Sequence, residues 1–139
     1  MEFLHKRNID YTSGYQPENI KRKIEEECRF GSYEFDDSGK ERYCKGHFRK
    51  LYNAFQEDEN VIIWLMDTIR IYGYTKIEKV ENTYDRGLNF FFSKKKEDLF
   101  IFEEPLTAKK VGLSLPISFS IKELKIEEMN KLAVFKKED

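Results

Sequence analysis

Short hydrophobic runs separated by polar clusters dominate the middle of the chain, between Val61 and Phe102. The runs are rich in Ile, Val, Phe, Tyr and Thr, and the clusters are typical of turns, which together indicate consecutive antiparallel strands. The expected strands cover residues 61–66, 69–81, 88–93 and 99–102. The first is almost wholly apolar and should lie inside the sheet. The last two should pair with each other across the charged KKKED turn.

The second of these strands alternates along its length. One face is expected to carry Ile69, Ile71, Gly73, Thr75 and Ile77, because successive side chains of a strand point to opposite sides. A glycine inside a strand indicates a bulge or a close approach of another backbone, so we expect one of these at Gly73.

A helix is expected before this region, beginning at Pro17, which suits the first turn of a helix. Ile20, Ile24 and Cys28 follow at a spacing of four in an otherwise charged segment, which predicts one buried stripe. The helix should end near Arg29, because Gly and Ser follow.

A strand is expected at residues 1–8, and a second helix should begin near Ser38, which has capping-box spacing to Glu41. The apolar face of that helix is formed by Phe48, Leu51, Tyr52 and Phe55.

After the strand region, Pro105 is expected to end the last of the four strands. Thr107 should cap a short helical turn that ends at Gly112, and residues 116–120 should form a closing edge strand. The tail from Ile121 onwards should contain a final helix.

Together these elements predict one α+β domain, with a curved antiparallel sheet or open barrel flanked by helices. Its 139 residues are enough to bury a core without disulfides or metals. Strands and helices do not alternate regularly, which disfavours a parallel nucleotide-binding sheet.

Net charge and targeting signals restrict the possible functions only weakly. Lys and Arg number 25 against 26 Asp and Glu, so a nucleic-acid site would have to be a local patch. No cationic segment followed by an apolar core marks a signal peptide, and the longest apolar run, residues 61–66, is too short to cross a bilayer. We therefore expect a cytoplasmic protein with no membrane association.

Metal binding is not expected. Cys28, Cys44, His5 and His47 lack the paired spacings of a structural zinc site, so buried or half-exposed cysteines are the better interpretation, and no cofactor is predicted.

Catalysis is not expected either. Asp67, Glu78, Lys79 and Glu81 include the residue types of a nuclease site without its arrangement, and chance explains them in a chain so rich in Lys and Glu. The chain has no glycine-rich phosphate loop and no nucleophile elbow.

Basic residues near the strands are candidates for phosphate contacts. A solvated turn is the favoured interpretation of Lys94, Lys95 and Lys96, with a phosphate-binding loop as the alternative. If the sheet curves, the cleft could be flanked by these lysines together with Arg70, Lys76 and Arg86.

Aromatic residues are candidates for contacts with a flat ring. Tyr11, Tyr33 and Tyr84 lie in or beside expected loops, whereas core packing is favoured for Trp64 inside its apolar strand. Aromatic faces that meet at the mouth of a sheet would form a slot for a nucleobase extruded from a duplex.

The strand region resembles the PUA-like superfamily, in particular its EVE and YTH branch. In that branch a strand carrying F/Y-G-x-x-x-I precedes an aromatic-bearing loop and then a strand pair with an acidic-Pro exit. Tyr72, Gly73 and Ile77 stand at these pattern positions, followed by the loop NTYDRG and the segment LNFFFSKKKEDLFIFEEPL. The segment NIKRKIEEECRFGSYEF resembles the preceding helix and aromatic turn.

The resemblance implies a non-catalytic nucleic-acid-binding domain that encloses a flipped, modified base in an aromatic pocket. It implies positions for the pocket residues Tyr11, Ser13, Tyr33, Trp64 and Tyr84. Backbone contacts would come from Lys76, Arg86, Lys94, Lys95 and Lys96.

Partners follow from the same resemblance, because some such domains are the DNA-reading module of McrB-like restriction systems. DNA or RNA is the expected ligand, with an AAA+ motor and a nuclease subunit as partners in a restriction or antiviral defence system. Two alternatives remain open: a small protein-interaction or phage/host-defence factor, and a hydrolase or nuclease with an unrecognised site.

Overall fold

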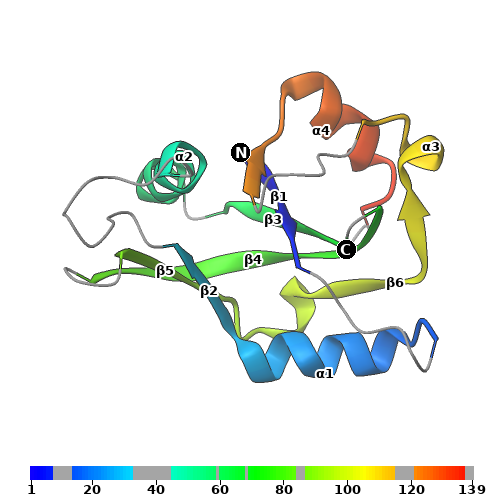
Figure 1. Cartoon of the computed structure of the whole chain (residues 1–139), viewed down its shortest axis with the longest axis horizontal. Helices are drawn as coiled ribbons and strands as arrows, with labels where there is room; N and C mark the ends of the chain where they lie inside the picture. Colours follow the sequence, from blue (N-terminus) through cyan, green and yellow to red (C-terminus); the bar gives the residue numbers. More distant parts are fainter. Residues whose placement is uncertain are drawn as a thin grey trace.

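The computed structural model describes residues 1–7, 14–32, 45–58, 60–67, 69–83, 87–114 and 121–136. In these residues a strongly curled mixed sheet is flanked by helices (Figure 1). The elements in chain order are β1 (Glu2–Lys6), α1 (Pro17–Glu27), β2 (Arg29–Ser32), α2 (Lys45–Glu57), β3 (Ile62–Met66), β4 (Arg70–Thr83), β5 (Gly87–Phe92), the 3-10 helix η1 (Lys96–Asp98), β6 (Phe100–Thr107), α3 (Ala108–Val111), β7 (Ile121–Glu123) and α4 (Ile126–Ala133).

The sheet confirms the predicted fold class, with one difference in strand direction. Its described strands run in the order β2-β5-β4-β3-β1-β7, and β6 also pairs with β4. All pairs are antiparallel except β1 with β3, which is parallel. A parallel pair needs a long crossover, and α1, β2 and α2 lie in the connection between these two strands.

Strand β4 is the centre of the sheet, because it pairs along both edges. One edge holds β3, while the other holds β6 along residues 70–74 and β5 along residues 77–83. The predicted pairing of the last two strands with each other is therefore wrong. Both run antiparallel to β4 and hence in the same direction, so the segment between them carries the chain along β4 rather than reversing it.

Gly73 lies at a bulge and at a close backbone approach, as predicted. The pairing register shifts beside it against both β3 and β6, and a Cβ placed on Gly73 would be 2.3 Å from the carbonyl oxygen of Phe100. The bulge reverses the alternation, so Ile71 faces the opposite side from Ile77. The single shared face predicted for this strand is wrong at Ile71, and Ile69 precedes the strand and is exposed.

Two hydrophobic clusters cover the two faces of the sheet. The larger packs α1 and α2 against side chains such as Ile63 and Leu65, and the other packs α3 and α4 against Trp64 and Met66. Alternate residues of β3 thus enter opposite clusters, which explains why the strand is almost wholly apolar.

The helix predictions hold where the structure describes them. Helix α1 begins at Pro17 and ends at Glu27, followed by Cys28 in a left-handed conformation with φ of 48°. Helix α2 begins at Lys45, and the predicted start near Ser38 lies outside the described residues.

The end of the strand region is partly different from the prediction. Strand β6 continues through Pro105 to Thr107, so Pro105 does not end it. Proline is tolerated because among the described strands β6 pairs only with β4 and the register is irregular there. Thr107 does cap a short helix, accepting a hydrogen bond from the Lys110 backbone at 3.1 Å, and Gly112 ends it with φ of 71°.

The final segment contains the predicted last helix, α4. The predicted edge strand at residues 116–120 lies outside the described residues. The following residues form β7, which pairs with β1.

Candidate nucleic-acid interface

The connection from β5 to β6 is ordered by its own side chains. The Ser93 hydroxyl donates to Asp98 at 2.5 Å and accepts from the Lys95 backbone at 3.2 Å. These bonds close the segment into a tight turn before η1. Three consecutive exposed lysines, Lys94, Lys95 and Lys96, here called the lysine turn, project from it.

Strand β4 anchors this turn and places Lys76 beside it. The Lys76 ammonium lies 3.7 Å from an Asp98 carboxylate oxygen, and its carbonyl accepts from the Ser93 backbone at 2.9 Å. The backbone N–H of Lys94 donates to Glu78 at 3.1 Å. The structure thus brings together Lys76 and the lysine turn, as predicted.

In the part of the chain that the structure describes, three hollows adjoin the lysine turn. The α1 hollow, about 240 Å³, lies between α1 and the turn, and the Lys136 hollow, about 640 Å³, is bordered by Tyr74 and Phe100. The Asn60 hollow, about 480 Å³, lies beside Phe55. Each hollow shares lysines with its neighbours, so the turn forms a common rim.

The rim carries more positive than negative charge. The lysines that line the three hollows are Lys21, Lys76, Lys79, Lys94, Lys95, Lys96 and Lys136, and the carboxylates are Glu25, Glu78, Glu97 and Asp98. Asp98 already contacts Lys76 and Ser93. The lysine turn makes no ion pair with a described residue, which leaves its charges available to an anion.

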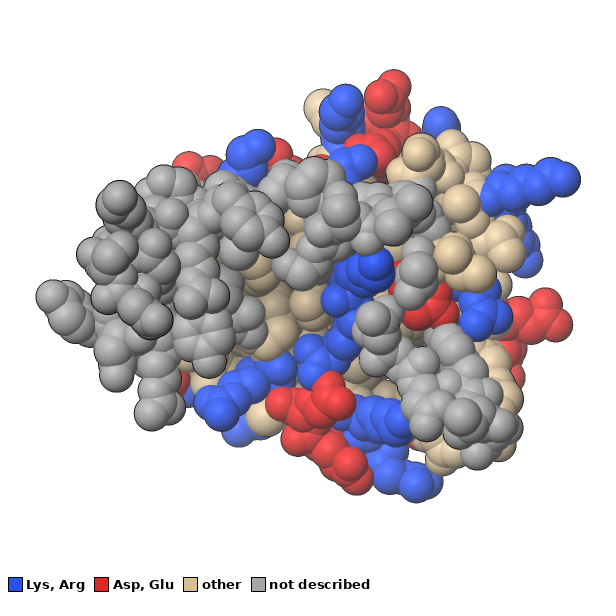
Figure 2. All heavy atoms as spheres, viewed as in Figure 1, with Lys and Arg blue, Asp and Glu red and all other residues tan. Residues whose placement is uncertain are grey.

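Basic side chains also gather on the face that carries β1 and α1, with acidic side chains beside them (Figure 2). Arg7, at the end of β1, forms an ion pair with Glu27 and lies 5.6 Å from the centre of the Phe92 ring. Burial lowers the pKa of Arg7. Its contacts are with the protein itself, so we do not assign it to the site.

Trp64 is a core residue. It is fully buried, its ring centre lies 4.9 Å from that of Tyr74, and its indole N–H donates to Glu2 at 2.7 Å. It lines none of the three hollows. This geometry supports the packing role that its apolar strand favoured.

The other predicted pocket residues lie outside the described residues: Tyr11, Ser13, Tyr33 and Tyr84. The same holds for Arg86, which was predicted to contact the nucleic-acid backbone. The aromatic pocket therefore stays a prediction.

Several residues of the site escaped sequence reasoning. Lys21 and Lys136 come from α1 and from the chain end after α4, and only tertiary folding brings them to the turn. Thr75 did carry a signal, because it is the polar member of an otherwise apolar stripe, and it lines the α1 hollow.

Two carboxylates that are candidates for a nuclease site, Asp67 and Glu81, contact other residues of the protein. Asp67 accepts from the backbones of Ile69 and Arg70 at 2.9 and 2.7 Å, and Glu81 pairs with Lys79 at 3.0 Å. In the described part of the chain no group of three or more His, Cys, Asp or Glu is placed to hold a metal ion.

No protein-family model matches the chain, and a search of curated proteins found no match. The resemblance to PUA-like domains accordingly rests on the sequence pattern. Among the described helices, none has the length and apolar character needed to cross a membrane.

Proposed function

We propose that this domain binds nucleic acid, with Lys76 and the lysine turn contacting phosphates. The observation that carries the proposal is the position of these residues around three adjoining hollows, in a chain whose net charge is only −1. Phosphate contacts by lysine supply most of the sequence-independent affinity for nucleic acid. A local basic rim is sufficient for such contacts even when the whole chain is nearly neutral.

The finer form of the proposal comes from the EVE/YTH resemblance. In it a flipped and modified base of DNA or RNA enters a pocket formed by Tyr11, Ser13, Tyr33 and Tyr84, with Arg86 near the backbone. The domain itself is not an enzyme. It would serve in the cytoplasm as the reading module of an McrB-like defence system, together with an AAA+ motor and a nuclease subunit.

Binding of single-stranded and duplex oligonucleotides, about ten nucleotides long, tests this proposal by fluorescence anisotropy. The double variant Lys94→Gln/Lys95→Gln should bind about tenfold more weakly than the wild type, because two phosphate contacts are lost. The matched control is Lys109→Gln/Lys110→Gln, which removes two consecutive exposed lysines of α3, outside the three hollows. Equal affinities for the two double variants, or no binding by the wild type, would refute the proposal.

A further inference from the structure

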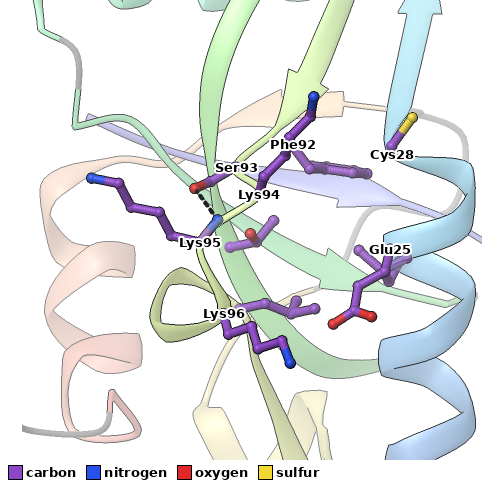
Figure 3. A pocket seen from close by; sticks show the side chains of 10 residues that line it. Glu25, Cys28, Phe92, Ser93, Lys94, Lys95 and Lys96 are labelled. Carbon is purple, nitrogen blue, oxygen red and sulfur yellow. Dashed lines mark hydrogen bonds between the residues drawn. The ribbon is translucent and has the colours of Figure 1, made fainter.

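The α1 hollow lies between α1 and the lysine turn. Ile24 and Glu25 of α1 and the following Cys28 form one side, and the end of β5 with the lysine turn forms the other (Figure 3). Ile24 and Phe92 are almost fully buried, and Leu99 is half-buried. The interior surface is therefore mostly apolar.

The Thr75 side chain adds a polar group to this apolar interior. Thr75 lines the hollow and is only 1% exposed, and its hydroxyl has no hydrogen-bond partner among the described residues. Buried polar groups are nearly always hydrogen-bonded, and an unpaired one costs stability. A hydroxyl in this position is consistent with a group that is satisfied by a ligand.

The mouth of the hollow carries positive charge. In Figure 3, Lys94 and Lys96 extend to different sides of the hollow, Lys95 points away from α1, and the Glu25 carboxylate lies on the side of Lys96. Two lysines, Lys94 and Lys96, and one carboxylate, Glu25, therefore border the mouth, so its net charge is positive and favours an anionic group there.

We infer that the α1 hollow binds a small organic anion that carries one flat ring system. The ring lies between the apolar walls, a polar ring atom hydrogen-bonds to the Thr75 hydroxyl, and the anionic group lies at the mouth beside Lys96. A volume of about 240 Å³ is smaller than the usual pocket for a drug-sized molecule, roughly 300–1,000 Å³. It therefore suits a single ring system with its phosphate or carboxylate outside.

This site goes beyond the proposed function, because it requires no polymer. A free mononucleotide belongs to the ligand class, and so does a carboxylate on a nitrogen-containing aromatic ring. A domain that binds ring-bearing anions but no oligonucleotide would retain this inference and lose the proposed function. The reverse result would retain only the proposed function.

Methyl-labelled NMR of the full chain provides the test. Adenosine monophosphate and nicotinate serve as ring-bearing anions, adenosine as a neutral ring, and inorganic phosphate as an anion without a ring. Both ring-bearing anions should shift the methyl signals of Ile24 and Leu99 and bind more tightly than adenosine, while phosphate leaves these methyls unchanged. The internal control is Leu132, which belongs to the other hydrophobic cluster and should not shift. Equal shifts at Leu132, or none at Ile24 and Leu99, would overturn the inference.

Variants of Thr75 separate ligand binding from packing. Thr75→Val keeps the shape and removes the hydroxyl, so affinity for adenosine monophosphate should fall about fivefold, while the melting temperature stays equal or rises. Thr75→Ser keeps the hydroxyl and should retain the affinity. Lys96→Gln should weaken binding about threefold, whereas Lys109→Gln should not. Unchanged affinity in Thr75→Val, or equal effects of the two lysine variants, would contradict the assigned geometry.

Discussion

Replacing Gly73 with alanine should destabilise the domain by about 2–3 kcal/mol, because the new methyl group has no room. A Cβ at this position would lie 2.3 Å from the carbonyl oxygen of Phe100, 2.7 Å from the Ile101 Cδ1 atom and 3.1 Å from its Cα atom. Two of these three neighbours are backbone atoms of β6, which cannot move aside as a flexible side chain would. The substitution must therefore push β6 away from the centre of the sheet.

Urea unfolding, followed by the fluorescence of Trp64, measures this loss of free energy of unfolding. A thermal scan gives a second measure: at roughly 3–4 °C per kcal/mol for a chain of this length, the melting temperature should fall by about 6–12 °C. The control is Gly112→Ala, because Gly112 has φ of 71° and the nearest atom to its added Cβ is a Lys131 side-chain carbon at 3.9 Å. That change should lower the free energy of unfolding by only about 1 kcal/mol, because alanine adopts the left-handed backbone conformation less readily than glycine. A smaller loss for Gly73→Ala than for Gly112→Ala would refute the close approach between β4 and β6.

Three further predictions concern other parts of the fold. Trp64→Phe should lower the free energy of unfolding by about 1–3 kcal/mol in urea titration, since it removes a buried indole and its hydrogen bond, without changing oligonucleotide affinity; a selective loss of affinity would contradict its core role. Glu128→Gln should lower the free energy of unfolding by about 0.5–1 kcal/mol at neutral pH. Burial raises the pKa of Glu128, but hydrogen bonds from Lys125 and Lys122 outweigh this effect and hold that pKa below its ordinary value of 4.5. The stabilisation by its charge is therefore complete above the ordinary pKa and lost as the pH falls through the lowered pKa. The free energies of unfolding of the wild type and Glu128→Gln, measured by urea titration, should converge in acid. A difference that stays constant with pH would contradict this. Thr107→Ala should cost about 1 kcal/mol in the same assay through loss of the α3 cap, and an unchanged midpoint would contradict that cap.

Local patterns predicted most of the strands, since alternation and turn residues act over a few positions. The same patterns did not show which strands pair. The sequence pattern predicted a hairpin of β5 and β6, but both strands pair with β4. The parallel pair of β1 with β3 joins Leu4 to Trp64, and no local signal specifies a contact over that distance in sequence.

The candidate site was predictable only in its local part. The three consecutive lysines and the polar side of β4 are visible as residues, and the charged turn indicated their exposure. Their proximity to Lys21, Lys136 and Glu25 depends on how α1 and the chain after α4 pack. The Thr75 hydroxyl has no hydrogen-bond partner among the described residues, and this too depends on tertiary surroundings rather than on a local sequence pattern.

The most direct test of nucleic-acid binding is the salt dependence of oligonucleotide affinity. The logarithm of the binding constant should fall linearly with the logarithm of the salt concentration. In Lys94→Gln/Lys95→Gln that slope should be shallower by about one to two, because each lost phosphate contact removes about one released counterion. Lys109→Gln/Lys110→Gln should keep the wild-type slope. Identical slopes for all three proteins would show that the lysine turn does not contact phosphates.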